Sequence, residues 1–152
     1  NYKFIQDLRA YCEKKVGELT FPDAILKRIM LANNPDKGEE FVEKNYAQSI
    51  KELTWHLIKE QLAKDHGIKI DDNDVRESAR QMARAQFAQY GMTNVPEDYL
   101  NGYADEMLKK RENVDSFVEA ALDRKLAEAI KEVVKLNVKT VSLEEFNKLV
   151  SE

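Results

Sequence analysis

The chain has 152 residues, of which 43% are hydrophobic and 34% are charged, so it can form a core and has a densely charged surface. Its net charge of -4 at pH 7 argues against non-specific binding to nucleic acids or anionic membranes. It has one cysteine, Cys12, which cannot form an internal disulfide, and no apolar run approaches the length of a membrane span. Because the chain begins without methionine and already in a helical pattern, we expect it to be a fragment of a longer protein.

Apolar residues at three- and four-residue steps predict helices from the first residues onward. The first helix covers residues 1–17 and ends at Gly17, and Pro22 lies in the first turn of the second. A turn-rich break over residues 33–38 precedes a long helix. This helix is expected to run from about Glu39 to Asp65, with Gly67 as its C-cap.

Four further segments follow the same pattern in the second half of the chain. Asp71 or Asp72 can cap a helix, residues 96–98 open another, and Ser142 and Glu145 have the spacing of a capping box. The inward stripe of the first of these helices is predicted to be Val75, Ala79, Met82, Ala83, Phe87 and Tyr90. The apolar residues of the next two are Tyr99, Leu100, Tyr103, Met107 and Leu108, then a strict four-residue row of Val114, Val118, Leu122, Leu126 and Ile130 flanked by Phe117 and Ala121. No stretch is typical of a strand, so the fold class is predicted to be all-α, with an open or elongated body.

Three similar phrases separate these helices: ELTFPDAIL, HGIKIDDNDV and KLNVKTVSLEEF. In each, one helix ends, a few alternating apolar residues follow, and Pro, Asp or Ser starts the next helix. This pattern indicates joints that set the direction of the chain, and it requires no internal duplication.

Motifs for catalysis or metal binding are absent from the sequence. The acidic run at residues 71–74 fails the EF-hand pattern, since positions six and twelve are Glu77 and Ala83 when the loop starts at Asp72. His56 and His66 are too few to form a zinc site, so no cofactor and no metal are expected. A basic edge of Arg76, Arg80 and Arg84 is interpreted as a solvated helix face, rather than as a nucleic-acid site.

Aromatic and methionine residues gather between positions 82 and 107. Their helical spacing is consistent with a packed core, but Met and Tyr also suit a surface that binds unrelated peptides. The sequence leaves both interpretations open. The residues are Met82, Phe87, Tyr90, Met92, Tyr99, Tyr103 and Met107.

The order of these pieces resembles the C-terminal domain of bacterial trigger factor, a ribosome-associated chaperone. The stretches that carry the resemblance are LTFPDAILKRIM, NYAQSIKELTWHLIKEQLAKDHGIKIDDNDVRESARQMA and VPEDYLNGYADEMLKKRENVDSFVEAALDRKLAEAIKEVVKLNVKTVSLEEF. The resemblance covers nearly the whole chain. It implies a single helical chaperone domain over residues 1–152, with a central body and two arms around a crevice.

The resemblance also implies a function in the cytoplasm without ATP, in which unfolded or nascent chains are held on apolar patches. The client-binding residues that it suggests are Met82 and Tyr99, with Phe87, Tyr90 and Tyr103 as neighbours and Ile29 and Met30 on the other arm. Extra residues over 91–95 and a glycine at Gly102 depart from the family pattern. The ribosome-binding and prolyl isomerase domains of full-length members are not expected in this chain. The resemblance also implies the family's links to protein transport and cell division.

Other classes of function stay open at this point. A helical module could bind one fixed partner or a second copy of itself, and a homodimer is compatible with the sequence. A periplasmic parvulin-linked chaperone has a related architecture. An enzyme is the least favoured class, and neither a nucleic acid nor a membrane is expected as a direct partner.

Overall fold

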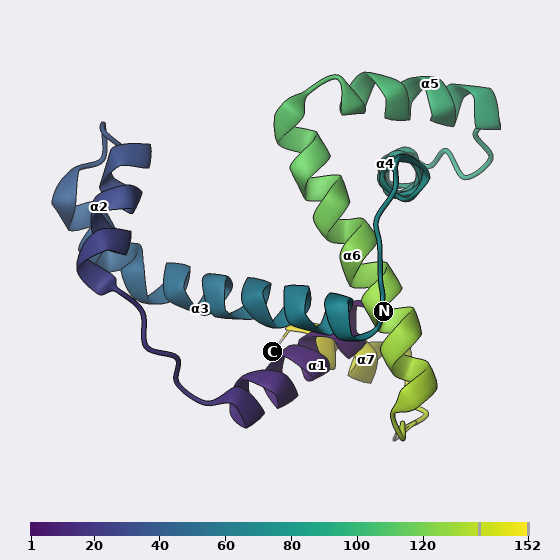
Figure 1. Cartoon of the computed structure of the whole chain (residues 1–152). Helices are drawn as coiled ribbons and strands as arrows, with labels where there is room; N and C mark the ends of the chain where they lie inside the picture. Colours follow the sequence, from purple (N-terminus) through teal and green to yellow (C-terminus); the bar gives the residue numbers. More distant parts are fainter. Residues whose placement is uncertain (137, 152) are drawn as a thin grey trace. The chain divides into compact units, whose positions relative to one another are not determined.

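The computed structural model describes residues 1–136 and 138–151. These residues form helices joined by turns and loops, with no strand (Figure 1), so the prediction of an all-α chain is confirmed. Asn137, in the third of the recurring phrases, lies outside the described residues. The helices are α1 (Tyr2–Val16), α2 (Asp23–Asn33), α3 (Gly38–Asp65), α4 (Asp72–Gln89), α5 (Glu97–Leu108), α6 (Arg111–Val133) and α7 (Leu143–Ser151).

Contacts divide the chain into two compact units. The N-terminal unit is Tyr2–Leu62, and the C-terminal unit consists of Asn1 and the residues from Ala63 onwards. The prediction of one domain over residues 1–152 concerns how the units combine, and it stays a prediction.

In the N-terminal unit, charged side chains join α1 to α3. The guanidinium of Arg9 donates two hydrogen bonds to the carboxylate of Glu52, both of 3.0 Å, and a third of 2.8 Å to Glu13. The same guanidinium lies 5.9 Å from the ring centre of Trp55, which is a cation–π distance. Paired hydrogen bonds of this kind orient the two helices more firmly than a single lysine contact would.

Polar contacts also join α2 to α3. Lys27 donates to both carboxylate oxygens of Glu43 at 2.8 Å, and the hydroxyl of Tyr46 donates to Asp23 at 2.6 Å. Val42 is the buried apolar residue in this part of α3. The side of α2 that carries Ile25 and Ile29 stays exposed.

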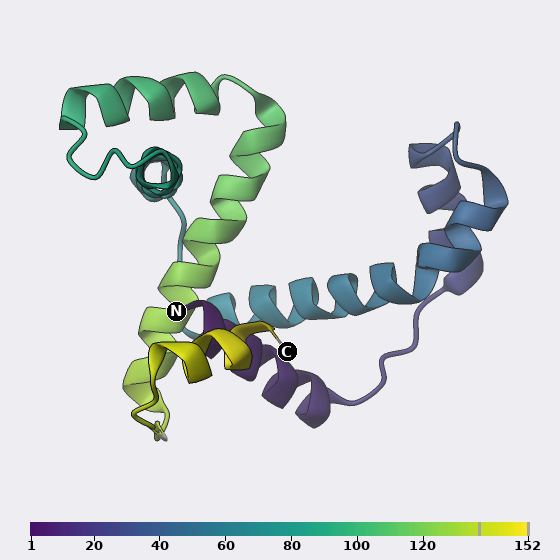
Figure 2. The same cartoon turned by 180° about the vertical axis from the view of Figure 1, so that it is seen from behind.

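The C-terminal unit has its core where α4, α5 and α6 pack together, and both views show these helices side by side (Figures 1 and 2). Ala79 of α4 and Ala104 of α5 are completely buried against Phe117 of α6. Alanines at the contact allow the backbones of α4 and α5 to approach closely. The partly buried residues Val75, Met107 and Leu108 extend this core.

The buried face of α6 only partly coincides with its apolar four-residue row. In the first half of the helix, Phe117 and Ala121 are buried, whereas Val114, Val118 and Leu122 of that row are only partly buried. The reason is geometric: a strict four-residue step turns by about 40° around the helix at each repeat. The row therefore reaches the core only in the second half, where Leu126 and Ile130 are buried.

The predicted ends of the helices are confirmed at the recurring phrases. After α3, Ile68 N–H bonds to Ala63 C=O at 2.8 Å and Gly67 N–H to Lys64 C=O at 3.1 Å, while Gly67 has a φ of +63°. These two bonds form a complete Schellman motif, whose left-handed position favours glycine. A capping box starts α7, since Ser142 and Glu145 exchange backbone-to-side-chain hydrogen bonds of 2.8 and 3.2 Å.

Candidate functional site

An open groove of about 410 Å³ lies on the surface of the C-terminal unit between α4 and α5. Phe87 comes from the last turns of α4, and the other lining residues come from α5. We call it the aromatic groove. Its lining residues are Phe87, Asp98, Tyr99, Gly102, Tyr103 and Glu106.

Two aromatic rings form the rigid part of the aromatic groove. The ring centres of Phe87 and Tyr103 are 5.4 Å apart and their planes meet at 60°. A tilted pair at this distance is a favourable arrangement of aromatic quadrupoles. The hydroxyl of Tyr103 donates a hydrogen bond of 2.9 Å to the side-chain oxygen of Gln86, which holds the ring from its polar end. The apolar wall is therefore formed before any ligand binds.

Solvent exposure places most of the aromatic and methionine residues on the surface, whereas Met107 packs against the core. Tyr99 is 72% exposed, Tyr103 42%, Met82 47% and Tyr90 83%, while Phe87 is half-buried. The prediction that Met82 and Tyr90 belong to the inward stripe of α4 was therefore wrong. The alanines of α4 and α5 already fill the narrow contact between these helices, and the larger side chains lie at its edges.

The structure brings three of the predicted site residues together and places two more nearby. Phe87, Tyr99 and Tyr103 share the aromatic groove. Met82 lies one helical turn before Gln86, the partner of Tyr103, so both are on one side of α4, and Tyr90 follows four residues after Gln86 as the C-cap of the helix. Exposed apolar side chains thus continue along α4 beyond the groove itself.

Gly102, Asp98 and Glu106 are groove residues that the sequence did not identify. They follow one another at four-residue steps, so they form one row along α5 with the glycine in the middle. A Cβ built on Gly102 would meet nothing within 4 Å, which shows open space above it. The signal was present in the sequence, because an interior helix glycine without a backbone need for it often marks a place where something else approaches.

The two remaining predicted residues belong to the N-terminal unit. Ile29 of α2 is 50% exposed, and Ile25 one turn earlier is exposed as well. Met30 is half-buried, and its sulfur accepts a weak hydrogen bond of 3.8 Å from the hydroxyl of Ser49 on α3. Ile25 and Ile29 therefore form a small apolar patch, whereas Met30 faces α3.

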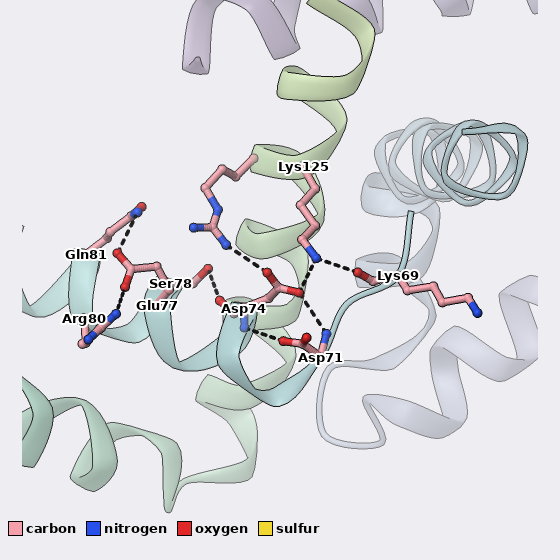
Figure 3. A network of polar contacts seen from close by, with 9 residues as sticks. Lys69, Asp71, Asp74, Glu77, Ser78, Arg80, Gln81 and Lys125 are labelled. Carbon is pink, nitrogen blue, oxygen red and sulfur yellow. Dashed lines mark hydrogen bonds and ion pairs between the residues drawn. The ribbon is translucent and has the colours of Figure 1, made fainter. Parts of the chain in front are cut away.

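The acidic residues at the start of α4 have a structural role (Figure 3). The Asp71 carboxylate accepts from the backbone N–H of Asp74 at 3.0 Å, and the Asp74 carboxylate accepts from the N–H of Asp71 at 3.0 Å. This reciprocal pair is a capping box, and it identifies Asp71, rather than Asp72, as the cap that the sequence had left open between the two. Within the described residues, no group of three histidine, cysteine or acidic side chains could hold a metal ion.

Asp74 also connects α4 to α6. Its carboxylate accepts from the ammonium of Lys125 at 2.5 Å, and Lys125 donates a second bond of 2.8 Å to the carbonyl of Lys69. The bond from Lys125 and that from the Asp71 N–H hold the pKa of the Asp74 carboxyl below its usual range. The network fixes the start of α4 against α6, and thereby helps to position the helix that carries Phe87.

The basic edge of α4 is occupied by ion pairs. Arg76 contacts Asp105 at 3.0 Å and Arg84 contacts Glu97 at 2.6 Å, so both arginines join α4 to α5 or its start. Arg80 pairs with Glu77 on its own helix. The Arg80–Glu77 pair is of the within-helix kind that the sequence interpretation expected, whereas the pairs of Arg76 and Arg84 cross to α5 and help to hold the two helices together.

A comparison with models of protein families matches residues 1–150 to the family described as "Probable trigger factor, C-terminal domain". The chain belongs to this family. Neither the search of curated proteins nor that of solved structures found a match. The trigger factor C-terminal domain is the chaperone domain of that protein and differs from its prolyl isomerase domain, so the family supports a chaperone-type role. Among the described residues, no helix of this trigger factor domain is long and apolar enough to cross a membrane.

Proposed function

We propose that this trigger factor C-terminal domain holds unfolded or nascent polypeptides, without ATP, on the aromatic groove and the exposed side chains around it. The exposure of Tyr99, Tyr103 and Met82 beside a preformed apolar wall is the observation that carries the proposal. Residues that only packed a core would be buried there. The cellular setting that fits this function is the cytoplasm, with the ribosome reached through another domain of the full-length protein.

The strength of binding follows from the size of the groove. A client side chain that leaves water gains roughly 1.5–3 kcal/mol, and the loss of client freedom offsets much of this. A groove of about 410 Å³ accepts one or two side chains, so one contact is weak. Affinity then comes from several such contacts along one client, for which the Ile25 and Ile29 patch of α2 is a second candidate. Weak single contacts allow the client to leave and fold.

A triple variant tests the proposal. Met82→Ser, Tyr90→Ser and Tyr99→Ser remove exposed apolar side chains and leave the half-buried Phe87 in place. We expect the variant to keep its helicity by circular dichroism but to suppress the aggregation of several unrelated unfolded proteins at least several-fold less well.

The control removes an exposed tyrosine elsewhere. Tyr11 of α1 is 61% exposed and is not part of the aromatic groove, so Tyr11→Ser should retain the activity. Equal activity of the triple variant and the unchanged protein would disprove a client-binding role for this surface. Binding to one partner alone, with no effect on other unfolded proteins, would favour the fixed-partner module instead.

A further inference from the structure

A second groove, of about 620 Å³, lies wholly within the N-terminal unit. One side is the segment 18–21, which links α1 to α2, and the other is a face of α3 that includes Ala47, Ile50 and Lys51. We call it the linker groove. The segment belongs to the first recurring phrase of the sequence, ELTFPDAIL, and the aromatic groove gives it no role.

The main chain of segment 18–21 has unused hydrogen-bonding groups. The segment has no secondary structure, and Figure 1 shows it running without a helical turn. Among the contacts of the described residues, the backbone N–H groups of residues 18–21 have no partner, and neither have the carbonyls of residues 18–20. The first main-chain group of the segment that has a hydrogen-bond partner is the carbonyl of Phe21, which accepts from the N–H of Asp23 at 2.9 Å. Such a row resembles the free edge of a strand.

The same row faces the linker groove. All four consecutive residues of segment 18–21 line it. In an extended chain, successive side chains point to opposite sides, so the side chains alone would let only every second residue line a groove. Since four consecutive residues line this one, the main chain itself borders the groove. Leu19 is exposed and Phe21 is half-buried, which adds apolar surface at every second position.

We infer that segment 18–21 binds one extended stretch of a client by main-chain hydrogen bonds, as an added strand. The inference rests on the proposed function, because the ligand is an unfolded polypeptide. Main-chain bonds give affinity without requiring a sequence, while apolar side chains of the client meet Leu19, Phe21 and Ile50 at alternate positions. An unfolded chain is the ligand that carries a continuous row of unpaired N–H and C=O groups.

The charges around the linker groove fit a ligand of unspecified sequence. Glu13 is bound to Arg9, and Asp23 accepts from the hydroxyl of Tyr46, so neither carboxylate is available. Glu18 and Lys51 have no ion-pair partner among the described residues. With one unpaired acidic and one unpaired basic side chain, the groove can accept a client whose neighbouring residues carry either charge. A site for one charged ligand would instead carry charges of a single sign.

Amide hydrogen exchange measured by NMR tests the inference on the whole chain. The probe is reduced and alkylated lysozyme, which stays unfolded. We expect saturating client to slow exchange at least tenfold at alternate N–H groups of residues 18–21, since only alternate groups of a strand face its partner. Bound client without slower exchange at these residues would overturn the inference and leave the aromatic groove as the site. Absence of client binding would overturn the proposed function as well.

A peptide series separates main-chain from side-chain recognition. The probe is a heptapeptide of alternating valine and lysine, together with two versions that are N-methylated at the odd or the even positions. If the peptide pairs as a strand, only the N–H groups along one of its edges bond to segment 18–21. Methylation of those groups removes two or three hydrogen bonds and should weaken binding about tenfold, whereas methylation of the other edge should leave the affinity nearly unchanged. Equal affinities of all three, or equal losses, would contradict strand pairing. Slower exchange that grows with protein concentration in the absence of client would show that a second copy fills the groove, which would also overturn the inference.

Discussion

Replacing Gly102 by leucine should make the protein more stable and at the same time a weaker client binder. The glycine lies inside α5, and a Cβ at this position meets nothing within 4 Å. A glycine in a helix interior costs about 0.8–1.0 kcal/mol relative to a good helix former, and leucine is one. The new side chain would also cover part of Phe87 and Tyr103, which line the same groove. We therefore expect a net gain of about 1 kcal/mol or slightly more in the free energy of unfolding.

The same leucine occupies the space that a client side chain would enter. A client side chain of similar size gains roughly 1.5–3 kcal/mol on burial, so its exclusion should weaken the binding of a short aromatic peptide at least tenfold. Thermal unfolding followed by circular dichroism should show a midpoint higher by about 4–8 °C, as expected for 1 kcal/mol in a unit of this size. Peptide affinity can be measured by fluorescence anisotropy on the same samples.

A matched alanine variant separates the two effects. Gly102→Ala provides the full gain in helix propensity, since alanine is the strongest helix former, but leaves most of the groove empty, so its stability should rise while peptide binding changes little. A destabilised leucine variant would show that the space above Gly102 is not open. A leucine variant that binds peptide as well as the unchanged protein would show that the client does not use the aromatic groove.

Two further predictions concern the structure that supports the groove. Because the Asp74 carboxyl has a lowered pKa in the folded state, its stabilising effect is complete above its unfolded pKa of about 3.9 and is lost as the pH falls through the lower, folded value. When the free energy of unfolding is measured against pH, Asp74→Asn should therefore lose less stability at acid pH than the unchanged protein does. The same loss in both proteins would argue against a stabilising role of the Asp74 carboxylate. Gly67→Ala should lower the free energy of unfolding by about 1 kcal/mol in urea denaturation, because φ is +63° and the Cβ meets no neighbour that could compensate. Gly67→Asn should lose less, since asparagine tolerates this conformation better; an alanine variant as stable as the unchanged protein would contradict the expected backbone strain.

The ends of the helices could be predicted from the sequence because the responsible interactions are local. Gly17, Gly67, Asp71 and Ser142 each act through bonds to residues within five positions. Their meaning is therefore contained in a short window of sequence. The family and the all-α class could be predicted for the same reason, since the order of such windows extends over almost the whole chain.

The inward faces were less predictable because they depend on which helices meet. An apolar row on α4 is compatible with either a core or a surface. Which of its residues are buried depends on where Ala104 of α5 packs against α4, and this contact is not visible in the local sequence. Tyr99 and Tyr103 consequently lie outside the contact. The interior glycine at position 102 is a signal in the sequence, but the groove that it opens exists only once Phe87 of α4 stands beside it. Such features need the tertiary structure.

The alanine contact between α4 and α5 has a consequence for how the aromatic groove can change. Ala79 and Ala104 have no side-chain torsions that could rearrange, so the spacing of the two helices is set by their backbones. A larger residue at either position would move the helices apart and widen the groove without touching a client. The width of the aromatic groove is thus encoded in residues behind it, and under the proposed function variation there would tune which clients fit while every lining residue stays the same.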